Sequence, residues 1–199
     1  QAALAAREYL SATPVQASVL EAPSERDLLV SAKTGSGKTV AYGLAMSANL
    51  MPEGAERLPQ AGAPLALIVA PTRELALQVK TELAWLYAQA GGRVASCVGG
   101  MDPMMERRAL NQGVHIVVGT PGRLRDHIER GNLNTQSLKV VVLDEADEML
   151  DLGFRDELEA ILDAVPAERR TLLFSATVPK PIAQLAKSYQ RDAQRIEVS

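Results

Sequence analysis

Residues 31–39 form a segment of small residues that ends in a lysine and a threonine, and they read Ser-Ala-Lys-Thr-Gly-Ser-Gly-Lys-Thr. An apolar run at residues 28–30 precedes the segment and a helix-forming run at residues 40–46 follows it, which predicts a strand, a tight loop and the start of a helix. Gly35 and Gly37 lack the Cβ atoms that would keep backbone N–H groups from curling around phosphate oxygens, and the helix N-terminus adds partial positive charge. The segment therefore predicts a phosphate-binding loop.

The side chains of this segment suggest specific roles. Lys38 can reach the β and γ phosphates of a nucleotide, and the Thr39 hydroxyl is placed to hold Mg²⁺. The common pattern is G-x-x-x-x-G-K-[ST], whose first position is Ala32 here. The structural alternative is a Gly/Ser turn with a solvated lysine, and the flanking strand and helix argue against it. The residues expected to bind the nucleotide are Thr34, Gly35, Ser36, Gly37, Lys38 and Thr39.

A second candidate segment is acidic and follows the apolar run at residues 140–143. A buried strand would deliver Asp144 to the edge of a sheet, where it can hold Mg²⁺ partly through water, and would set Glu145 beside it to orient or deprotonate an attacking water. The alternative is an ordinary acidic cluster at a helix N-terminus, and these residues alone leave the two interpretations balanced. The upstream phosphate-binding loop favours the second half of a nucleotide site.

Composition limits the class of protein. The chain has 199 residues, 47% of them hydrophobic, which suits one domain with a proper core. No apolar run approaches the length needed to span a bilayer, so no membrane contact is expected. The chain has a single cysteine, which excludes a disulfide framework and suits a reducing cytoplasm. This residue, Cys97, lies in an apolar run and is predicted to be buried.

Charge and aromatic content limit how nucleic acid could bind. The net charge of −3 excludes a generally polycationic surface, so such contacts must come from local basic groups and backbone donors. The aromatic content of 4% argues against base-stacking platforms.

Apolar, β-branched runs alternate with helical patterns along the chain. Expected strands cover residues 28–31, 66–70, 94–98, 115–118, 140–143 and 171–174. Expected helices cover residues 2–10 and begin after Thr13, Thr72, Asp102 and Thr120, while residues 51–64 read as a surface loop. Near-continuous apolar strands belong in a parallel sheet that is covered on both faces. We therefore predict an α/β fold with a doubly wound, mostly parallel sheet and with ligands at the carboxyl ends of its strands.

Seven motifs occur in a fixed order along the chain. They are Thr-Pro-x-Gln at 13–16, the loop at 32–39, Pro-Thr-Arg-Glu-Leu-Ala at 71–76, Gly-Gly at 99–100, Thr-Pro-Gly-Arg at 120–123, Asp-Glu-Ala-Asp at 144–147 and Ser-Ala-Thr at 175–177. In this order they resemble the N-terminal, RecA-like lobe of DEAD-box RNA helicases over essentially the whole chain. The resemblance implies a P-loop ATPase that uses ATP and Mg²⁺ and remodels RNA.

The resemblance also implies roles for single residues. Gln16 would bind the adenine edge, since its amide offers one hydrogen-bond donor and one acceptor. Without the resemblance, Gln16 is better explained as a polar residue in the first turn of a helix. The family often has a glycine where Glu8 stands, and its adenine-stacking aromatic would precede Gln1, so we expect reduced adenine affinity. The residues that would couple the ATP state to the RNA grip are Asp147, Ser175 and Thr177.

Further positions match those where the family grips RNA. They are Arg73, Gly99, Gly100, Thr120, Gly122 and Arg123. Helix N-termini, glycines that allow close backbone approach and arginine charge all address phosphate and sugar, so binding is expected to be independent of sequence. Cations are disfavoured at a helix N-terminus unless an anion is near, which argues against a purely solvated role for the two arginines.

We expect residues 1–199 to be a single RecA-like domain, with a Gln-motif region at 1–24 and a P-loop ATPase core at 25–199. The family's second lobe, with its arginines, is not found in this chain, which we expect to be a truncated first lobe that binds nucleotide. Losing an arginine finger costs about three to five powers of ten in rate, so hydrolysis should be nearly absent. The alternatives are another P-loop nucleic-acid translocase and a non-catalytic RNA-binding module.

Four remaining residues are expected to have structural roles. His115, which would open a strand, and His127, on an exposed-looking helix, are predicted to be structural or solvated. Trp85 and Tyr87 are predicted to pack in the long helix that follows Arg73.

Overall fold

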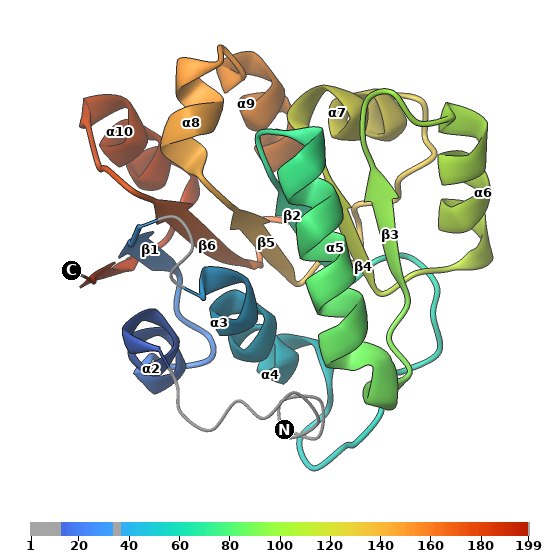
Figure 1. The fold of residues 1–199 in the computed structure, drawn as a ribbon, viewed down its shortest axis with the longest axis horizontal. Coiled ribbons are helices and arrows are strands. Elements are labelled where there is room, and N and C mark those ends of the chain that lie inside the picture. The colour runs from blue at the N-terminus through green and yellow to red at the C-terminus, as the bar shows by residue number, and fades with distance from the viewer. Residues whose placement is uncertain (1–12, 34–36, 199) are drawn as a thin grey trace.

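The computed structural model describes residues 13–33 and 37–198 and contains one sheet of seven strands (Figure 1). The expected helix at residues 2–10 and the loop residues Thr34, Gly35 and Ser36 lie outside the described residues. Every pairing between neighbouring strands is parallel, and the order across the sheet is β3-β4-β2-β5-β6-β1-β7. The strands are β1 (Leu28–Ser31), β2 (Ala66–Val69), β3 (Val94–Cys97), β4 (Ile116–Gly119), β5 (Val140–Leu143), β6 (Arg170–Ser175) and β7 (Gln194–Glu197).

Both faces of the sheet are buried, which is why its central strands are continuously apolar. In β5, Val140 and Val142 pack into the core on one face, and Val141 and Leu143 pack into the core on the other. All four residues of β5 are fully buried. Since side chains alternate between the faces of a strand, a sheet covered on both sides needs apolar residues at every position. The predicted doubly wound fold is confirmed.

Helices cover the two faces in separate groups. One core takes side chains from α2 (Pro14–Glu21), α3 (Lys38–Ala45), α4 (Ser47–Leu50) and α5 (Arg73–Tyr87). The other takes side chains from α6 (Pro103–Gln112), α7 (Pro121–Glu129), α8 (Ala146–Asp151), α9 (Arg155–Ala164) and α10 (Lys180–Tyr189). A short 3₁₀ helix, η1 (Ala88–Ala90), extends α5. Among the described residues, no helix combines the length and the apolar character that crossing a bilayer requires.

The predicted helix starts are confirmed and have visible causes. The Thr13 and Thr72 side chains accept hydrogen bonds from backbone N–H groups three residues later, and Asp102 accepts one from Met104 N. Thr120 holds the extended conformation of a cap, but its side chain makes no capping hydrogen bond with any described residue. The caps at Thr13, Thr72 and Asp102 satisfy N–H groups that a helix N-terminus would otherwise leave unpaired.

Strand β7 is not among the strands predicted from the sequence, the last of which covers residues 171–174. This strand pairs with β1 along its full length, with Leu28 opposite Gln194 and Ser31 opposite Glu197. Ile196 is its one buried residue. A strand at the edge of a sheet can be mostly polar, so it gives no apolar run to detect.

The strand order divides the carboxyl edge of the sheet into two parts. Strands β5, β6 and β1 are neighbours, and the segments after them are 144–147, 175–177 and the loop before α3. Strands β2, β4 and β3 are neighbours as well, and the segments after them are 71–76, 120–123 and 99–100. The residues expected to bind nucleotide and those expected to bind RNA thus lie in adjoining halves of one edge.

Candidate functional site

The predicted phosphate-binding loop and the acidic strand end meet at Lys38. The Lys38 ammonium lies 2.9 Å from Oδ1 of Asp144 and 3.2 Å from Oε2 of Glu145. Lys38 is the first residue of α3 and Asp144 directly follows β5, so 106 positions of chain separate two side chains in contact. Only 8% of the Lys38 side chain and none of the Asp144 side chain is exposed. Charges buried to this degree are stable only when they are paired, so the Lys38 ammonium stabilises the buried Asp144 carboxylate.

The second oxygen of Asp144 is held by a residue that the sequence reading did not single out. The Tyr42 hydroxyl donates a 2.9 Å hydrogen bond to Oδ2 of Asp144, while Oδ1 lies 2.9 Å from the Lys38 ammonium. Burial raises the pKa of Asp144, although Lys38 opposes that shift. Burial also raises the pKa of Tyr42 well above its usual range, so the phenol remains a donor. One carboxylate oxygen is fixed and the other is left for an ionic partner.

Glu145 adopts a backbone conformation that is unusual for a residue with a side chain. Its φ is 53° and its ψ is 52°, in the left-handed region, at the position just before α8. Such a conformation costs roughly 1–3 kcal/mol and persists only where the surrounding structure enforces it. Here the buried β5 on one side and the start of α8 on the other set the turn, which directs the Glu145 side chain to Lys38.

The oxygen atoms of this site suit Mg²⁺ as ligands. Hard cations prefer oxygen ligands, and Asp144 Oδ1 is a buried carboxylate oxygen that faces the Lys38 charge. Thr39, next to Lys38, is also buried and carries a hydroxyl. The carboxylate and the hydroxyl are therefore the groups of this site that fit the ion.

Gln16 lies beside the loop and makes contacts at both ends of its amide. Its Oε1 accepts from Thr13 N at 3.0 Å, and its Nε2 donates to the Gly37 carbonyl at 3.2 Å. Gly37 has a φ of 82°, and a Cβ there would lie 2.8 Å from the Gln16 amide nitrogen. The predicted position of Gln16 in a first helical turn is confirmed, and the amide also joins α2 to the phosphate-binding loop.

The Ser-Ala-Thr segment contacts the acidic segment directly. Asp147 Oδ2 accepts a hydrogen bond of 3.1 Å from Thr177 N and one of 3.0 Å from Thr177 Oγ1. Ser175 donates its hydroxyl proton to the Thr177 carbonyl, so it shapes the turn and does not reach Asp147. The structure thus brings together two of the three residues expected to couple the sites.

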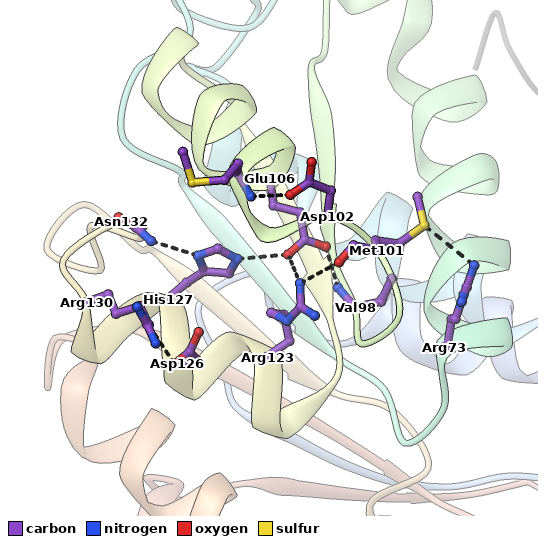
Figure 2. Close-up of polar contacts among 11 residues, drawn as sticks. Arg73, Val98, Met101, Asp102, Glu106, Arg123, Asp126, His127, Arg130 and Asn132 are labelled. Atoms are coloured by element: carbon purple, nitrogen blue, oxygen red, sulfur yellow. Dashed lines mark hydrogen bonds and ion pairs between the residues drawn. The ribbon is translucent and has the colours of Figure 1, made fainter.

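On the other half of the edge, the turn that joins Val98 to Met101 and contains Gly99 and Gly100 lies between two arginines, Arg73 and Arg123 (Figure 2). Gly100 has a φ of 84°, and a Cβ there would lie 2.5 Å from Nη1 of Arg73. Arg73 Nη2 contacts Met101 Sδ at 3.5 Å, and Arg123 Nη1 donates to the Met101 carbonyl at 3.2 Å. The turn needs glycine because the left-handed backbone is closely bordered by an arginine side chain. Gly99 and Gly122 are exposed, which leaves their backbones open to a partner.

Arg123 also has an anionic partner, Glu106, which the sequence reading did not identify. Arg123 Nη1 lies 2.8 Å from Oε1 of Glu106, and only 15% of the Arg123 side chain and 6% of the Glu106 side chain are exposed. The cation in the first turn of α7 is therefore compensated by a carboxylate from α6. Because the pairing is between distant segments, no local pattern could have revealed it.

His127 corrects an expectation. It was expected on an exposed-looking helix, but it is 1% exposed and its Nε2 lies 2.8 Å from Glu106 Oε1. Polar neighbours in sequence suggested exposure, whereas the side chain points into the contact between α6 and α7.

The buried positions expected for Cys97 and Tyr87 are confirmed. His115 is buried with ring contacts to Arg93 N and the Pro59 carbonyl, just before β4.

Comparisons with known proteins agree with this arrangement. The family model described as DEAD/DEAH box helicase matches residues 13–185. The DEAD-box ATP-dependent RNA helicase CshA of Bacillus licheniformis is 42% identical over 191 residues, which is 96% of this chain and 38% of that relative. The ATP-dependent RNA helicase DeaD of Haemophilus influenzae is 47% identical over 174 residues, which is 86% of this chain and 27% of that relative.

Solved structures show the same fold. The crystal structure of a DEAD box protein from the hyperthermophile Methanococcus jannaschii matches with a TM-score of 0.89 and 38% identity, and the match covers 100% of this chain and 53% of that one. A hypothetical ATP-dependent RNA helicase from Sulfolobus tokodaii matches with a TM-score of 0.88 and 32% identity, covering 99% and 56%. The chain thus spans well under two thirds of each of these proteins. Since the family model, the curated relatives and the solved structures all match most or all of the chain, this protein belongs to the DEAD/DEAH box helicase family.

Proposed function

We propose that this chain is the nucleotide-binding lobe of an ATP-dependent RNA helicase, which hydrolyses ATP and remodels RNA when a second RecA-like lobe completes it. The observation that carries the proposal is the contact of Lys38 with Asp144 and Glu145, at 2.9 and 3.2 Å. A lysine at the start of a loop-borne helix and two acids at the end of a neighbouring strand are the parts that phosphoryl transfer needs on one side of the nucleotide.

The charges of the site suggest how nucleotide binds. The Lys38 charge is shared between two carboxylates, and the β and γ phosphates of a bound nucleotide would take over that charge. Backbone N–H groups of the loop, including Thr34, Gly35, Ser36 and Gly37, would surround the phosphates. Thr39 and Asp144 would hold Mg²⁺, which when bound offsets phosphate charge. Gln16 would present its amide to the adenine edge while it remains part of the α2 cap.

Glu145 is the group best placed to act on water. It follows Asp144 at the strand end, and its side chain is 13% exposed, so it borders both the buried acid and the open side of the site. A carboxylate in that place would accept a hydrogen bond from the attacking water and take its proton. Interaction with Glu145, first as a hydrogen-bond partner, raises the pKa of the neighbouring Glu148.

RNA would bind on the other half of the sheet edge. The N-termini of α5 and α7, the Gly99–Gly100 turn, Gly122 and the guanidinium groups of Arg73 and Arg123 all offer donors to phosphate and sugar. Such contacts read no bases, so binding would not depend on RNA sequence. The hydrogen bonds between Asp147 and Thr177 join the segments that follow β5 and β6, and β5 neighbours β2 of the RNA half, so this contact would couple the two halves through β5.

Two experiments test the ATPase proposal. Calorimetry with this chain, an ATP analogue and Mg²⁺ should show binding that Lys38→Ala removes and that Lys187→Ala, at an exposed lysine of α10, leaves intact. In the full-length protein, Glu145→Gln should retain ATP and RNA together without turnover. Normal turnover by Glu145→Gln, or nucleotide binding that does not depend on Lys38, would contradict the proposed roles.

A third experiment tests the division between the lobes. We propose that the 199-residue chain by itself hydrolyses ATP at a rate about three to five powers of ten below the full-length protein, because the proposed second lobe would supply the arginine finger. Strong RNA-stimulated hydrolysis by this chain would refute that proposal. Competition between single-stranded RNA and DNA for the full-length protein tests the RNA preference. The buried Cys97 thiol is compatible with a reducing cytoplasm, which we propose as the location of the protein.

A further inference from the structure

One buried carboxylate joins the two RNA-facing segments. Glu106 Oε2 accepts a hydrogen bond of 2.9 Å from Val98 N, and its Oε1 lies 2.8 Å from both Arg123 Nη1 and His127 Nε2 (Figure 2). Val98 is the residue immediately before the Gly99–Gly100 turn. A single side chain on α6 therefore fixes the end of β3 and the first two turns of α7.

The burial of Glu106 makes these contacts obligatory. A carboxylate that is 6% exposed is stable only if its oxygens receive charged or strong hydrogen-bond donors, and Glu106 receives three. The acid also lies in the first turn of α6, where the helix dipole favours negative charge. His127 is held in turn by Asn132 Nδ2, 3.1 Å from its Nδ1, so the network extends beyond α7.

The same cluster could be mistaken for a metal site. Ligand atoms of Cys97, Glu106 and His127 all lie within 4.8 Å of one another. The Arg123 guanidinium, however, already occupies the Glu106 oxygen that such an ion would share. Burial also raises the pKa of Cys97 to about 12, which opposes formation of a ligating thiolate. The cluster is a hydrogen-bonded network around an arginine.

The network leaves part of Arg123 free to bind an anion. Both hydrogen bonds that Arg123 makes with described residues, to Glu106 and to the Met101 carbonyl, use Nη1. Its Nη2 and Nε, which can bind phosphate together, have no partner among the described residues. Since the Met101 carbonyl follows the Gly-Gly turn, the guanidinium is tied to the same loop whose backbone N–H groups would face the RNA.

We propose that Glu106 is a positioning residue for RNA binding, which holds Arg123 and the Gly99–Gly100 turn in one fixed arrangement before RNA arrives. The proposal rests on the proposed function, in which these groups contact the RNA backbone. An arginine and a loop that are ordered in advance lose less conformational entropy on binding, and this raises affinity without any contact between Glu106 and RNA.

The test uses the full-length protein with a non-hydrolysable ATP analogue and a fluorescent single-stranded RNA, whose anisotropy reports binding. Glu106→Gln removes the charge that orients Arg123, and we expect RNA affinity to fall about tenfold, the size of one charge-assisted hydrogen bond. The matched control is Glu129→Gln, which removes the same charge from an exposed pair with Arg125 on α7 and should change affinity less than about twofold. Nucleotide affinity without RNA should be unchanged in both.

A double-mutant cycle separates positioning from general loss of structure. Arg123→Ala should weaken RNA binding and reduce the dependence of log affinity on log salt by about one unit. If Glu106 acts through Arg123, Glu106→Gln should cost little more in the Arg123→Ala background. Additive effects would overturn the proposal. An increase in RNA affinity on Glu106→Gln would overturn it too, because Glu106 would then only be competing with RNA for the arginine.

Two further results complete the test. Glu106→Asp keeps the charge but shortens its reach, so weaker RNA binding supports positioning and unchanged binding overturns it, even where Glu106→Gln fails to fold. If neither Arg123→Ala nor Arg73→Ala affects RNA binding, the proposed RNA surface itself is wrong. If both arginine variants weaken binding while Glu106→Gln does not, only the positioning role fails.

Discussion

The hydroxyl of Tyr42 donates a 2.9 Å hydrogen bond to Oδ2 of Asp144, the buried acid that also pairs with Lys38. Tyr42 lies in α3, four residues after Lys38, so the helix that carries the lysine also orients the acid on the neighbouring strand. The Tyr42 ring packs against Phe174 of β6 with ring centroids 5.3 Å apart, which fixes the phenol from its other side. The first acid of the site is therefore oriented by two elements before any ligand binds.

Removal of that hydroxyl should affect metal-dependent binding most. Tyr42→Phe retains the ring and leaves Oδ2 of Asp144 without its donor, and we expect a loss of about 1 kcal/mol in the free energy of unfolding. Since residues that orient ligands commonly affect metal affinity, the Mg²⁺ concentration needed for half-maximal nucleotide binding should rise about tenfold. A Mg²⁺ titration of nucleotide binding measures this, with binding in excess chelator unchanged.

Tyr87→Phe is a matched control for that change. Its phenol is also buried and donates to the Gly43 carbonyl in α3, so the variant loses a similar hydrogen bond without touching Asp144. It should lower stability by a comparable amount and leave the Mg²⁺ titration unaltered. Equal shifts of the titration in both variants would mean that the Tyr42 hydroxyl has no special effect on Asp144.

The contact between Asp147 and Thr177 should matter for coupling more than for binding. Thr177→Val removes the 3.0 Å hydroxyl contact but keeps the backbone N–H contact at 3.1 Å. In the full-length protein we expect RNA stimulation of ATP hydrolysis to fall about fivefold, the equivalent of one hydrogen bond, while ATP affinity without RNA stays unchanged. Thr81→Val, at an exposed hydroxyl that bonds to Leu77 within α5, should leave stimulation intact. Equal stimulation in the wild type and Thr177→Val would exclude a coupling role for this hydroxyl.

Cys97 should react only when the protein unfolds. Burial raises its thiol pKa from 9.0 to about 12, which lowers the thiolate fraction in the folded state about a thousandfold at neutral pH. Iodoacetamide labelling at pH 8 should therefore be slow and should accelerate along the urea unfolding curve. Rapid labelling of the folded protein would contradict the buried position.

The same shift predicts a pH dependence of stability. The Cys97 thiol has a higher pKa in the folded protein than in the unfolded chain, so between about pH 9 and 12 only the unfolded thiol ionises. The contribution of Cys97 to the free energy of unfolding is therefore complete below about pH 9 and is lost as the pH rises toward 12. Cys97→Ala should remove this part of the alkaline loss. Urea unfolding at several values of pH between 8 and 10.5 compares the two proteins, and identical slopes would count against a buried thiol.

Arg170 should contribute to stability and not to ligand binding. It opens β6 at the edge of the sheet opposite the site, and it donates to the carbonyls of Arg26, Ala45 and Pro23 as well as to Asn49 Oδ1. Burial lowers its pKa, but a guanidinium remains charged. Arg170→Lys cannot make these divergent contacts and should cost about 2 kcal/mol or more of the free energy of unfolding, with nucleotide affinity unchanged.

A surface arginine serves as the control for that variant. Arg155→Lys changes an exposed pair with Glu159 within α9 and should alter stability by less than about 0.5 kcal/mol. Chemical denaturation of both variants measures the difference, and similar small losses would show that the carbonyl contacts of Arg170 add little.

The sequence alone determined the features that depend on neighbours along the chain. The apolar strands could be read because a sheet covered on both faces demands apolar residues at every position, as in β5. Helix starts at Thr13, Thr72 and Asp102 could be read because capping uses residues within three positions of each other. The meeting of Lys38 with Asp144 could be predicted as well, since parallel strands place their carboxyl ends at one edge.

Only the tertiary structure decided which distant groups share a contact. Glu106 looks like one more acid in a helix, and its pairing with Arg123, His127 and Val98 N exists because β3, α6 and α7 pack together. Tyr42 reads as a core aromatic until α3 places its hydroxyl on Asp144. The buried position of His127 was misread for the same reason. Periodicity reports the local environment of a residue, whereas the partner of a buried polar atom depends on the order in which strands and helices are brought side by side.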